Sequence, residues 1–436
     1  MNAEDSSPDN RFFIKTLGCK VNQYESQAIR ELLLNAGFKE CLSKETADVY
    51  IINTCTVTHK AEAESRYWAG VFHKANPDAR IVITGCCAEK DEGLFSAMPG
   101  ISNIIKNKDK SKIVALLSST PNSLLPTPNY NLRITDFKNH SKAFVKIQDG
   151  CTNFCSYCKV PYVRGPLISK PINDVAEEIS ILAARGFKEI VLTGICLGAW
   201  GSDLQEKQDI VDALKALDDL PGDFRIRLSS IEPKYVTDEL IDLIAQNKRF
   251  CRHLHIPIQS GDDEILAKMN RPYTSQQIRD IIVKIRKRIE GIGITTDIMI
   301  GFPGESEENF RNSVSLIKNI MPVKTHIFPF SRREGTAAFA MAQDVSQEVI
   351  KIRFQQMQTA AIAASYLFRE KLVNKTLSVL VETKREKYSG RLAGYSDNYV
   401  RVMFDGPDTI MKTIAPVKIT DSNLTYTLGV IVPFFS

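Results

Sequence analysis

Three cysteines stand close together in the middle of the chain. Cys151, Cys155 and Cys158 form a C-x3-C-x2-C pattern. Thiolates are soft ligands that suit iron–sulfur clusters and zinc. A structural zinc site is closed by four ligands, and the sequence offers no fourth ligand beside this triplet. Three thiolates on a four-iron cluster would instead leave one iron open to a substrate or cofactor.

An open iron is what a radical S-adenosylmethionine (SAM) enzyme requires. That iron binds the amine and carboxylate of the methionyl group and breaks a sulfur–carbon bond. The competing interpretations of the triplet are a zinc site and incidental packing, and the absence of a nearby fourth ligand weakens the first of them. Taken alone, the triplet therefore predicts a four-iron cluster with one open iron at these three cysteines.

A second set of cysteines is spread over the first ninety residues. Cys19, Cys55 and Cys86 each follow a predicted strand. In a parallel sheet these strand ends meet at one edge, where α/β folds bind ligands. One such cysteine is usually a core residue, but three in equivalent places favour a second cluster. The remaining cysteines receive no ligand role: Cys41 and Cys251 are expected to be core residues or neutral ones, and the roles of Cys87 and Cys196 stay open.

Composition sets the class of protein. The chain has 436 residues, of which 43% are apolar and 25% charged, and its net charge is +5. These values fit a soluble globular protein and are compatible with nucleic-acid binding. The polar N-terminus lacks the features of a secretory signal, and no apolar run approaches a membrane span. We therefore expect a cytoplasmic protein without a membrane partner, in which ten cysteines serve metal binding or chemistry.

The first section alternates strand and helix patterns, which predicts an α/β fold with a parallel sheet in an N-terminal domain of residues 10–117. Residues 118–141 are rich in turn formers and are expected to be a linker. The expected elements of the domain are strands at Phe12–Leu17, Val49–Asn53 and Arg80–Thr84 and helices at Tyr24–Asn35 and Ala61–Lys74.

Six strand patterns separated by helical patterns follow, and they predict a partial (β/α)6 barrel over residues 142–370. Chemistry in such barrels lies at the C-terminal ends of the strands. The clearest helix begins at Thr274, which can form a capping box with Gln277. A long helix is expected from Val345 to Val373. The expected strands are Phe144–Gln148, Glu189–Thr193, Arg225–Ser229, His253–Pro257, Thr295–Ile300 and Thr325–Phe330.

The last section, residues 371–436, changes to short strands between turns, which predicts a small all-β barrel of the oligonucleotide-binding type. Basic and aromatic residues are interleaved in it, and such residues contact phosphates and stack on unpaired bases. A solvated surface is the alternative interpretation of these residues, which are Lys384, Arg385, Lys387, Arg391, Arg401, Tyr388, Tyr395 and Tyr399.

Taken together, the motifs resemble the methylthiotransferase family of radical SAM enzymes from about Phe12 to Pro433. The three sections are similar to that family's cluster-binding domain, radical SAM barrel and RNA-binding TRAM domain. The sequence departs from the family's motifs at Glu89, at Cys196 and at Leu167–Ile168, where the family usually has other residue types. The stretches that carry the resemblance are Thr16–Asn22, Asn53–Val57, Gly85–Ala88, Val145–Cys151, Pro161–Gly165, Leu192–Gly194, Ser229–Pro233, His255–Gly261 and Asp297–Glu305.

The resemblance implies an enzyme with two [4Fe-4S] clusters and SAM as cofactors. Phe330–Thr336 and Gly394–Val402 are most similar to the tRNA N6-threonylcarbamoyladenosine methylthiotransferase subgroup. That subgroup adds a methylthio group to C2 of the adenosine next to the anticodon, in two SAM-dependent steps. The same chemistry on N6-isopentenyladenosine in tRNA or on a ribosomal-protein aspartate stays as an alternative.

The resemblance also implies the site residues. Reduction of the cluster on Cys151, Cys155 and Cys158 would convert SAM to methionine and a 5′-deoxyadenosyl radical. A second cluster on Cys19, Cys55 and Cys86, with Cys86 and not Cys87 as the family's ligand, would hold the sulfur. SAM contacts are expected from Tyr157, beside the adenine, and from Thr193, Gly194, Gln259 and Ser260, although an ordinary turn explains Gln259–Gly261 equally well.

The implied partners are the anticodon stem-loop of tRNA and an electron donor such as flavodoxin or ferredoxin. A hypothesis of another class is a non-catalytic, zinc-containing RNA-binding protein. Iron and sulfide analysis separates the two, because zinc without iron would exclude the radical chemistry.

Overall fold

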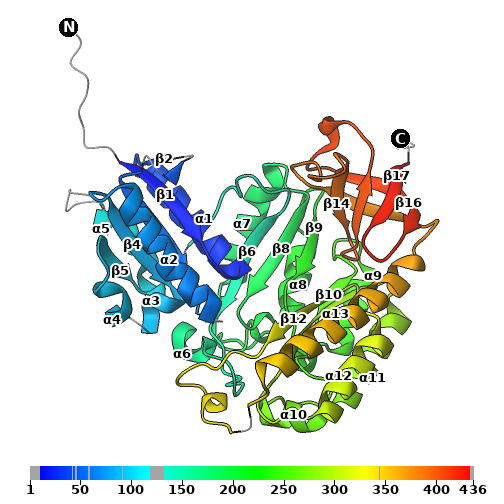
Figure 1. Cartoon of the computed structure of the whole chain (residues 1–436). Helices are drawn as coiled ribbons and strands as arrows, with labels where there is room; N and C mark the ends of the chain where they lie inside the picture. The colour runs from blue at the N-terminus through cyan, green and yellow to red at the C-terminus, as the bar shows by residue number, and fades with distance from the viewer. Residues whose placement is uncertain are drawn as a thin grey trace. The chain divides into compact units, whose positions relative to one another are not determined.

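The computed structural model describes residues 10–41, 43–44, 47–56, 59–90, 92–117, 132–342 and 344–432 (Figure 1). The chain divides into two compact units. The first runs to Asp136 and includes residues 150–152 and 158–168; the second holds residues 137–149, 153–157 and 169 onward. Within the described ranges, no helix is long and apolar enough to cross a membrane. The expected linker lies outside the described residues from 118 to 131, whereas Leu132, Ile134 and Phe137 are buried.

The first unit is built on a parallel five-stranded sheet in the order β2-β1-β3-β4-β5, which confirms the expected parallel α/β fold. The three expected strands are present, and β2 and β5 are additional. The elements are β1 (Arg11–Thr16), α1 (Lys20–Asn35), β2 (Lys39–Glu40), β3 (Val49–Thr54), α2 (His59–Ala75), β4 (Arg80–Gly85), α3 (Cys86–Lys90), α4 (Glu92–Ser96), β5 (Ile101–Ile105), η2 (Asn107–Lys112), α5 (Ile113–Leu117) and α6 (Val160–Arg164).

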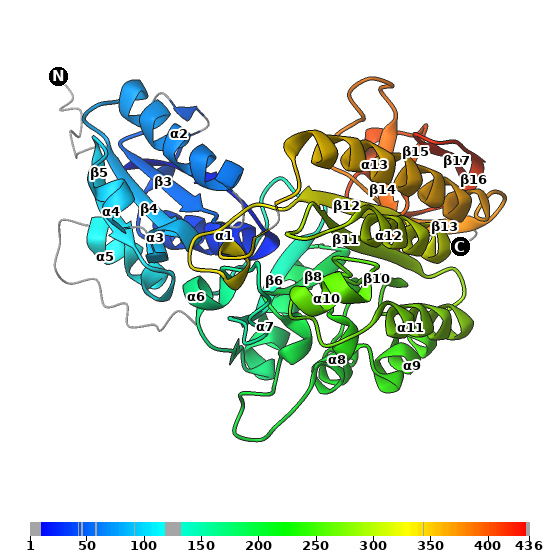
Figure 2. The same ribbon diagram turned by 60° about the horizontal axis from the view of Figure 1, so that its bottom comes forward.

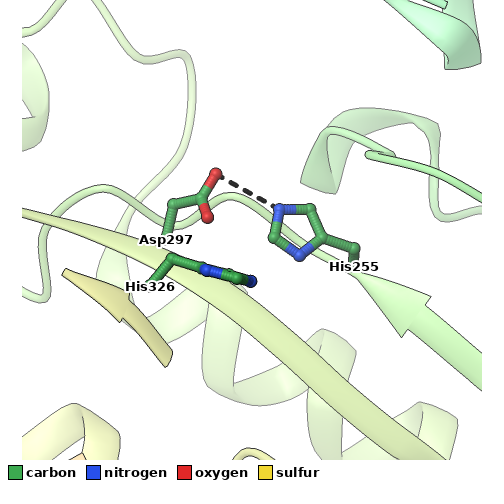
Figure 3. Close-up of side chains that lie close together, drawn as sticks. All are labelled: His255, Asp297 and His326. Atoms are coloured by element: carbon green, nitrogen blue, oxygen red, sulfur yellow. Dashed lines mark hydrogen bonds and ion pairs between the residues drawn. The ribbon is translucent and has the colours of Figure 1, made fainter. Parts of the chain in front are cut away.

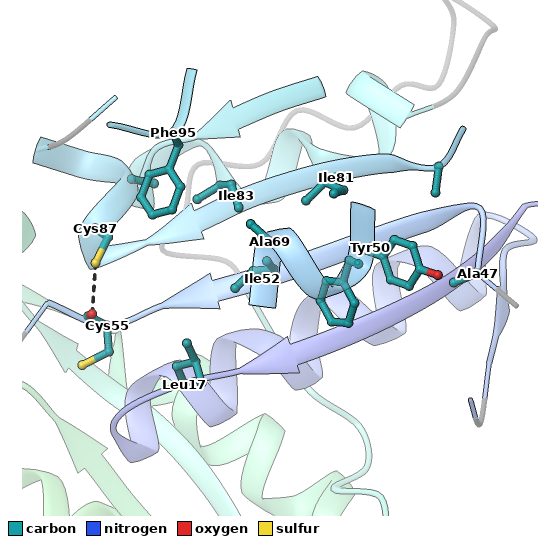
Figure 4. Close-up of a cluster of buried hydrophobic side chains, with 13 residues drawn as sticks. Leu17, Ala47, Tyr50, Ile52, Cys55, Ala69, Ile81, Ile83, Cys87 and Phe95 are labelled. Carbon is teal, nitrogen blue, oxygen red and sulfur yellow. Dashed lines mark hydrogen bonds between the residues drawn. The ribbon is translucent and has the colours of Figure 1, made fainter. Parts of the chain in front are cut away.

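Helices cover both faces of this sheet, so its central strand β3 is buried along its whole length. This is why Val49–Thr54 is a continuous apolar run and not an alternating one. On one face Tyr50 and Ile52 of β3 pack with Phe72 of α2, as Figure 4 shows for the strand residues. The opposite face packs against α1 and α5. Two cores therefore hold the strand ends, where the cysteines lie.

The second unit contains an open barrel of six main strands, as expected. A four-stranded sheet, β7-β6-β8-β9, is joined to a three-stranded sheet, β10-β11-β12, by a bridge between Ser230 and His255. In Figure 2 helices α7, α8, α9, α11 and α12 lie outside these strands. The elements are β6 (Ala143–Asp149), β7 (Ile168–Ser169), α7 (Ile172–Ala184), β8 (Glu189–Gly194), α8 (Ile210–Asp218), β9 (Arg225–Leu228), α9 (Asp238–Gln246), β10 (His253–His255), α10 (Asp263–Lys268), α11 (Ser275–Arg288), β11 (Gly293–Ile300), α12 (Glu307–Ile320), β12 (Lys324–Pro329) and α13 (Gln347–Glu370).

Helix α11 shows how local sequence fixes these elements. Thr274 and Gln277 form the expected capping box, and Ile278, Ile282 and Ile285 are buried on one face. Gly291 lies just after the end of the helix and has a φ of 70°, a conformation that glycine adopts without strain.

The C-terminal section closes into a five-stranded barrel in the order β13-β14-β15-β17-β16, which is consistent with a TRAM domain. Its core of aliphatic side chains includes Val379, Val402 and Val417 and continues onto Phe368 at the end of α13. The strands are β13 (Thr376–Val381), β14 (Leu392–Ser396), β15 (Arg401–Phe404), β16 (Ile414–Ser422) and β17 (Thr427–Ile431).

A buried ionic group joins this small barrel to the larger one within the second unit. Glu189, the first residue of β8, accepts hydrogen bonds from Arg225 and Arg227 of β9. Arg225 also donates to the carbonyl oxygens of Ser378 and Tyr395, at 2.8 and 2.9 Å. Arg227 donates likewise to the carbonyls of residues 396 and 397. The C-terminal barrel is thus held at the amino ends of the larger barrel's strands.

Aromatic rings extend the same junction. Tyr399 stacks on His253 with ring centroids 4.4 Å apart, and the Arg227 guanidinium lies 5.1 Å from the Tyr399 ring. Tyr395 packs against Tyr399 and lies under the ammonium of Lys142. Two of the tyrosines expected to stack on RNA bases are therefore engaged within the protein.

Candidate functional site

The strand order places three cysteines at the switch point of the first unit's sheet. In sheets of order 2-1-3-4-5, ligands bind beyond the carboxyl ends of the strands where the order reverses, between the first and third strands. Cys19 follows β1 as the residue before α1, and Cys55 follows β3. Cys86 follows β4 as the first residue of α3. The fold thus brings these three strand ends to one edge.

Two glycines allow the strand ends to approach one another. Gly18 has a φ of +90°, and a Cβ atom on it would lie 2.7 Å from the Sγ of Cys55. Gly85 has a φ of +94°, and its Cβ would lie 2.4 Å from the carbonyl oxygen of Thr54. Only glycine fits both positions, because a side chain would be strained and would also collide with the neighbouring strand end.

Cys86 receives a hydrogen bond from a buried arginine of α6. The Nε of Arg164 donates to the Cys86 sulfur at 3.3 Å. The same guanidinium donates to Glu25 at 2.6 Å and to the Asn22 side-chain oxygen at 2.6 Å. Lys110, also fully buried, forms a second ion pair with Glu25. Burial lowers the pKa of the Lys110 ammonium, although Glu25 opposes that change. The cation in direct contact with the sulfur is therefore the guanidinium of Arg164.

The electrostatics of Cys19 reflect the same surroundings. Cys19 is solvent-exposed, unlike the buried Cys55 and Cys86. Desolvation by the protein packed around its sulfur still raises the pKa of the Cys19 thiol above its ordinary value, while the nearby Arg164 opposes that rise. Cys86 also contributes to the rise in the pKa of the Cys19 thiol, which places these two sulfurs in one electrostatic environment.

Cys87 differs from its neighbour Cys86. It is fully buried in the core, and its thiol donates to the carbonyl oxygen of Cys55 at 3.0 Å, as drawn in Figure 4. Its backbone N–H donates to Thr54 Oγ1. Burial raises the pKa of the Cys87 thiol to about 11. These contacts are those of a structural residue that positions the loop after β3.

The loop carrying the C-x3-C-x2-C motif is held by contacts at each end. Gly150 has a φ of +74°, and a Cβ on it would lie 1.7 Å from the carbonyl oxygen of Pro166, so no other residue fits there. The N–H of Cys151 donates to the Gly165 carbonyl, and the sulfur of Cys158 accepts from the N–H of Val160. The three motif cysteines are partly exposed, as ligands to an incoming cofactor need to be.

Cys155 has an arginine partner of its own in the second unit. Nη1 of Arg271 lies 3.4 Å from the Cys155 sulfur and 2.8 Å from a carboxylate oxygen of Glu232. Both candidate clusters thus have one cysteine that accepts a hydrogen bond from a largely buried arginine. The motif alone did not identify either arginine, although Arg164 lies in the stretch Pro161–Gly165 quoted above.

The residues expected to contact SAM occupy different environments. Tyr157 is partly buried and packs against a small core that includes Met269 and Phe302. Thr193 is buried at the end of β8, next to Gly194. These three residues keep their predicted role, which no contact in the structure tests.

The Gln259 and Ser260 pair forms a turn with defined internal contacts. Gln259 has a φ of +72° and bridges to β11 through backbone hydrogen bonds with residues 297 and 299. Ser260 is fully buried, and its hydroxyl lies 3.3 Å from that of Ser313 and accepts from the N–H of Asp262. The hydroxyl of Ser260 is thus engaged in fixing the turn.

Cys196 follows β8 and is buried beside the motif loop. The Asn153 amide lies 3.6 Å from its sulfur, and its backbone N–H donates to Gln148 Oε1 at 2.7 Å. Its surroundings tie β6, β8 and the motif loop together.

The donor sets fit the two expected clusters in chemistry. Each triplet offers three thiol sulfurs and an arginine that stabilises negative charge on sulfur. Among the described residues, one set of three candidate ligands has donor atoms within 4.8 Å of one another, and it contains no cysteine: His255, Asp297 and His326. The thiolates of a four-iron cluster lie farther apart than the ligands of a single ion, so a donor-to-donor distance of 4.8 Å is not expected of the cysteine triplets.

Family models match two parts of the chain. Residues 145–317 match the model of the radical SAM superfamily. Residues 11–105 match that of an uncharacterized protein family, UPF0004. The two matches cover the first unit's sheet and the larger barrel from β6 into α12.

Curated relatives are similar over nearly the full length. A threonylcarbamoyladenosine tRNA methylthiotransferase, MtaB, of Bacillus subtilis is 35% identical over 427 residues, covering 95% of this chain and 94% of the relative. The MtaB of Thermotoga maritima is 35% identical, with 90% and 91% coverage. A tRNA-2-methylthio-N(6)-dimethylallyladenosine synthase of Clostridium tetani is 32% identical, with 95% of each chain covered.

Solved structures share the fold at low sequence identity. The radical SAM methyltransferase TsrM of Kitasatospora setae, with cobalamin and a [4Fe-4S] cluster bound, superposes with a TM-score of 0.54 at 17% identity, covering 76% of this chain and 77% of TsrM. The radical SAM enzyme OxsB with aqua-cobalamin bound gives 0.51 at 11% identity, covering 88% and 64%. At these identities the likeness shows the fold alone.

Proposed function

Because the chain belongs to the methylthiotransferase family of radical SAM enzymes, we propose that it adds a methylthio group to N6-threonylcarbamoyladenosine next to the anticodon of tRNA. Relatives named for that substrate are 34–35% identical to this chain, and those named for dimethylallyladenosine are 32–33% identical. The dimethylallyl substrate, the N6-isopentenyladenosine of the sequence analysis, is therefore the second candidate.

The observation that carries the proposal is the pairing of two cysteine sets. One set follows three strand ends at the switch point of a parallel sheet, and the other forms a compact C-x3-C-x2-C motif. A methylthiotransferase needs one centre that makes a radical and one that supplies sulfur. We assign Cys151, Cys155 and Cys158 to the first [4Fe-4S] cluster and Cys19, Cys55 and Cys86 to the second. When bound, these clusters and SAM supply the radical and the methylated sulfur.

The protein's own residues then hold and tune these groups. Arg164 and Arg271 donate hydrogen bonds to Cys86 and Cys155. These contacts would stabilise the anionic thiolates of bound clusters and so raise the clusters' reduction potentials. Tyr157 and the residues at the end of β8 are proposed to line the SAM pocket, together with the turn after β10.

The C-terminal barrel is proposed to contact the anticodon stem-loop. Tyr388 is 90% exposed and lies beside the ammonium of Lys387, so this tip offers a ring and a charge to RNA. Arg385 and Arg391 form ion pairs with nearby aspartates and are less available. We also propose that a flavodoxin or ferredoxin is the reductant and that the protein is cytoplasmic. The proposed domains are residues 10–117, 142–370 and 371–436.

Mass spectrometry of tRNA nucleosides from cells lacking the protein tests the substrate. The expected result is loss of the 2-methylthio form of threonylcarbamoyladenosine, with its unmodified precursor accumulating, and restoration by the wild-type gene. Loss of the methylthio form of isopentenyladenosine instead would move the proposal to the second candidate. Unchanged levels of both would refute a tRNA substrate of either kind.

Cluster number needs its own test. A variant with Cys151, Cys155 and Cys158 all changed to alanine should retain one [4Fe-4S] cluster by iron and sulfide analysis. A variant with Cys87→Ala serves as the control and should retain both clusters. If the triple variant lost all iron while remaining folded, the assignment of the N-terminal cluster would be wrong.

A further inference from the structure

Three potential metal ligands meet on neighbouring strands of the second unit (Figure 3). His255 ends β10, Asp297 lies in β11, and His326 lies in β12 directly opposite Asp297 in the strand register. Their donor atoms all lie within 4.8 Å of one another, and all three residues are partly buried. The rings of His255 and His326 are 5.9 Å apart and inclined at 66°. Side chains from three consecutive strands therefore converge on one point.

The donor set selects a class of ion. Two imidazoles and one carboxylate suit zinc, iron(II) and other first-row divalent ions, whereas magnesium and calcium prefer oxygen ligands alone. Three protein ligands with an open fourth position are also the pattern of catalytic zinc sites, in which water occupies that position.

One ligand-to-ligand distance already matches such an ion. Nε2 of His255 lies 3.2 Å from Oδ2 of Asp297. Tetrahedral bonds of about 2.0–2.2 Å separate two ligands by about 3.4 Å. An imidazole lone pair and a carboxylate oxygen repel each other unless a proton or a metal ion lies between them. A proton on Nε2 would satisfy this pair alone, as a hydrogen bond. The convergence of His326 on the same point is what favours a metal ion, because a proton needs no third ligand.

The other ring nitrogen of His255 has the partner that a metal-bound histidine needs. Nδ1 lies 2.8 Å from Oγ1 of Thr295, which is buried on β11 and also lies 2.9 Å from Nε2 of His253. A histidine that binds metal usually donates its second N–H to such an acceptor, which fixes the tautomer and directs the free lone pair at the ion. With Nδ1–H donating to Thr295, the lone pair of Nε2 faces Asp297 and can bind an ion shared with that carboxylate.

A pocket adjoins one of the three proposed ligands. His326 lines a pocket of about 370 Å³ between β12 and α13, together with Lys324, Phe328, Gln358 and Ser365. A metal site requires an entry path in addition to its ligands, and this pocket borders His326 among the three.

We propose that His255, Asp297 and His326 bind one first-row divalent cation, of which Zn²⁺ is the probe, with water as the fourth ligand. The site uses no cysteine and does not depend on which nucleoside the protein modifies. It is also independent of the two clusters, so its test can fail without affecting the proposed function.

The experiment uses the full chain, prepared anaerobically so that its cysteines keep the iron that they bind. The protein is incubated with Zn²⁺, passed through a desalting column and analysed for zinc and iron per chain, and the zinc is examined by X-ray absorption. Variants are His326→Ala, Asp297→Asn and Thr295→Val. The matched control is His59→Ala, a histidine of α2 whose side chain is 68% exposed.

The expected result is one zinc per wild-type and control chain, bound by nitrogen and oxygen only. His326→Ala and Asp297→Asn should bind zinc at least tenfold more weakly, with unchanged iron content and circular dichroism. Thr295→Val, which keeps all three ligands, should weaken binding by about 10–100-fold through the lost orienting contact. Sulfur in the zinc shell, equal zinc retention by His326→Ala, or no zinc on the wild type would each overturn the proposal.

Discussion

The buried carboxylate of Glu189 should be a major determinant of the second unit's stability. It lies between two buried arginines, and changing it to glutamine leaves their charges without a counterion. Removing one partner of a buried ion pair costs about 3–5 kcal/mol, because the remaining charge stays desolvated. We therefore expect Glu189→Gln to lower the free energy of unfolding of this unit by about that amount.

The neighbouring surface pair supplies the control. Lys188 lies next to Glu189 in sequence and pairs with Asp223, whose side chain is 89% exposed. An exposed pair contributes about 0–1 kcal/mol, so Asp223→Asn should change stability little. The two substitutions remove the same charge from adjacent places and differ mainly in burial.

The assay can report on this unit alone. The chain has two tryptophans, of which Trp200 is buried in the second unit and Trp68 belongs to the first. In a Trp68→Phe background, urea unfolding followed by fluorescence reads Trp200. Stability of Glu189→Gln within about 1 kcal/mol of the Asp223→Asn variant would refute the reasoning, because the ion pair would then behave as a surface pair.

Three further outcomes are expected. Burial opposes ionisation of Glu189, but its two arginines outweigh that effect and hold the pKa of the carboxyl well below its ordinary value. The stability that the ionised carboxylate contributes is therefore present above the ordinary pKa and should be lost as pH falls below about 4.5. Acid unfolding followed by Trp200 fluorescence, compared with the Glu189→Gln variant, checks this dependence. Arg164→Met should lower the reduction potential of the N-terminal cluster, since the substitution removes a positive charge and a hydrogen-bond donor to Cys86. Redox titration followed by electron paramagnetic resonance, in the variant lacking the motif cysteines, measures this potential, and an unchanged value would contradict the assigned contact. Gly85→Ala should reduce N-terminal cluster loading by iron analysis, whereas Gly37→Ala, with a similar φ but nothing within 4 Å of its added Cβ, should not; equal loading in both variants would show that the close approach is unimportant.

The sequence predicted the large elements well because their signals are strong. β3 is a continuous apolar run in a sheet covered on both faces, and α11 has both a capping box and a one-sided row of isoleucines. Among the strands that were missed, β2 and β7 have two residues each, which is too short for a pattern to emerge. The strand β5 was missed for another reason, since most of its residues are only partly buried.

The site was predictable only where chemistry is concentrated in one residue type. Cysteine is a rare residue type with few common roles, so both triplets could be identified from spacing and strand position. Arg164, Lys110 and Glu25 could not, because they lie up to 139 positions apart and meet only in the folded unit. The same holds for His255 and His326, which come from strands separated by about seventy residues.

The junction between the two barrels leaves the surface sequence of the C-terminal barrel free to evolve. The arginines of β9 are anchored to four carbonyl oxygens of the C-terminal barrel, which belong to Ser378, Tyr395, Ser396 and Asp397. Carbonyl oxygens are present whatever the side chain. The outer surface of the small barrel can therefore diversify, residue by residue, without detaching from its support, and a module from another protein with the same backbone could be grafted in its place.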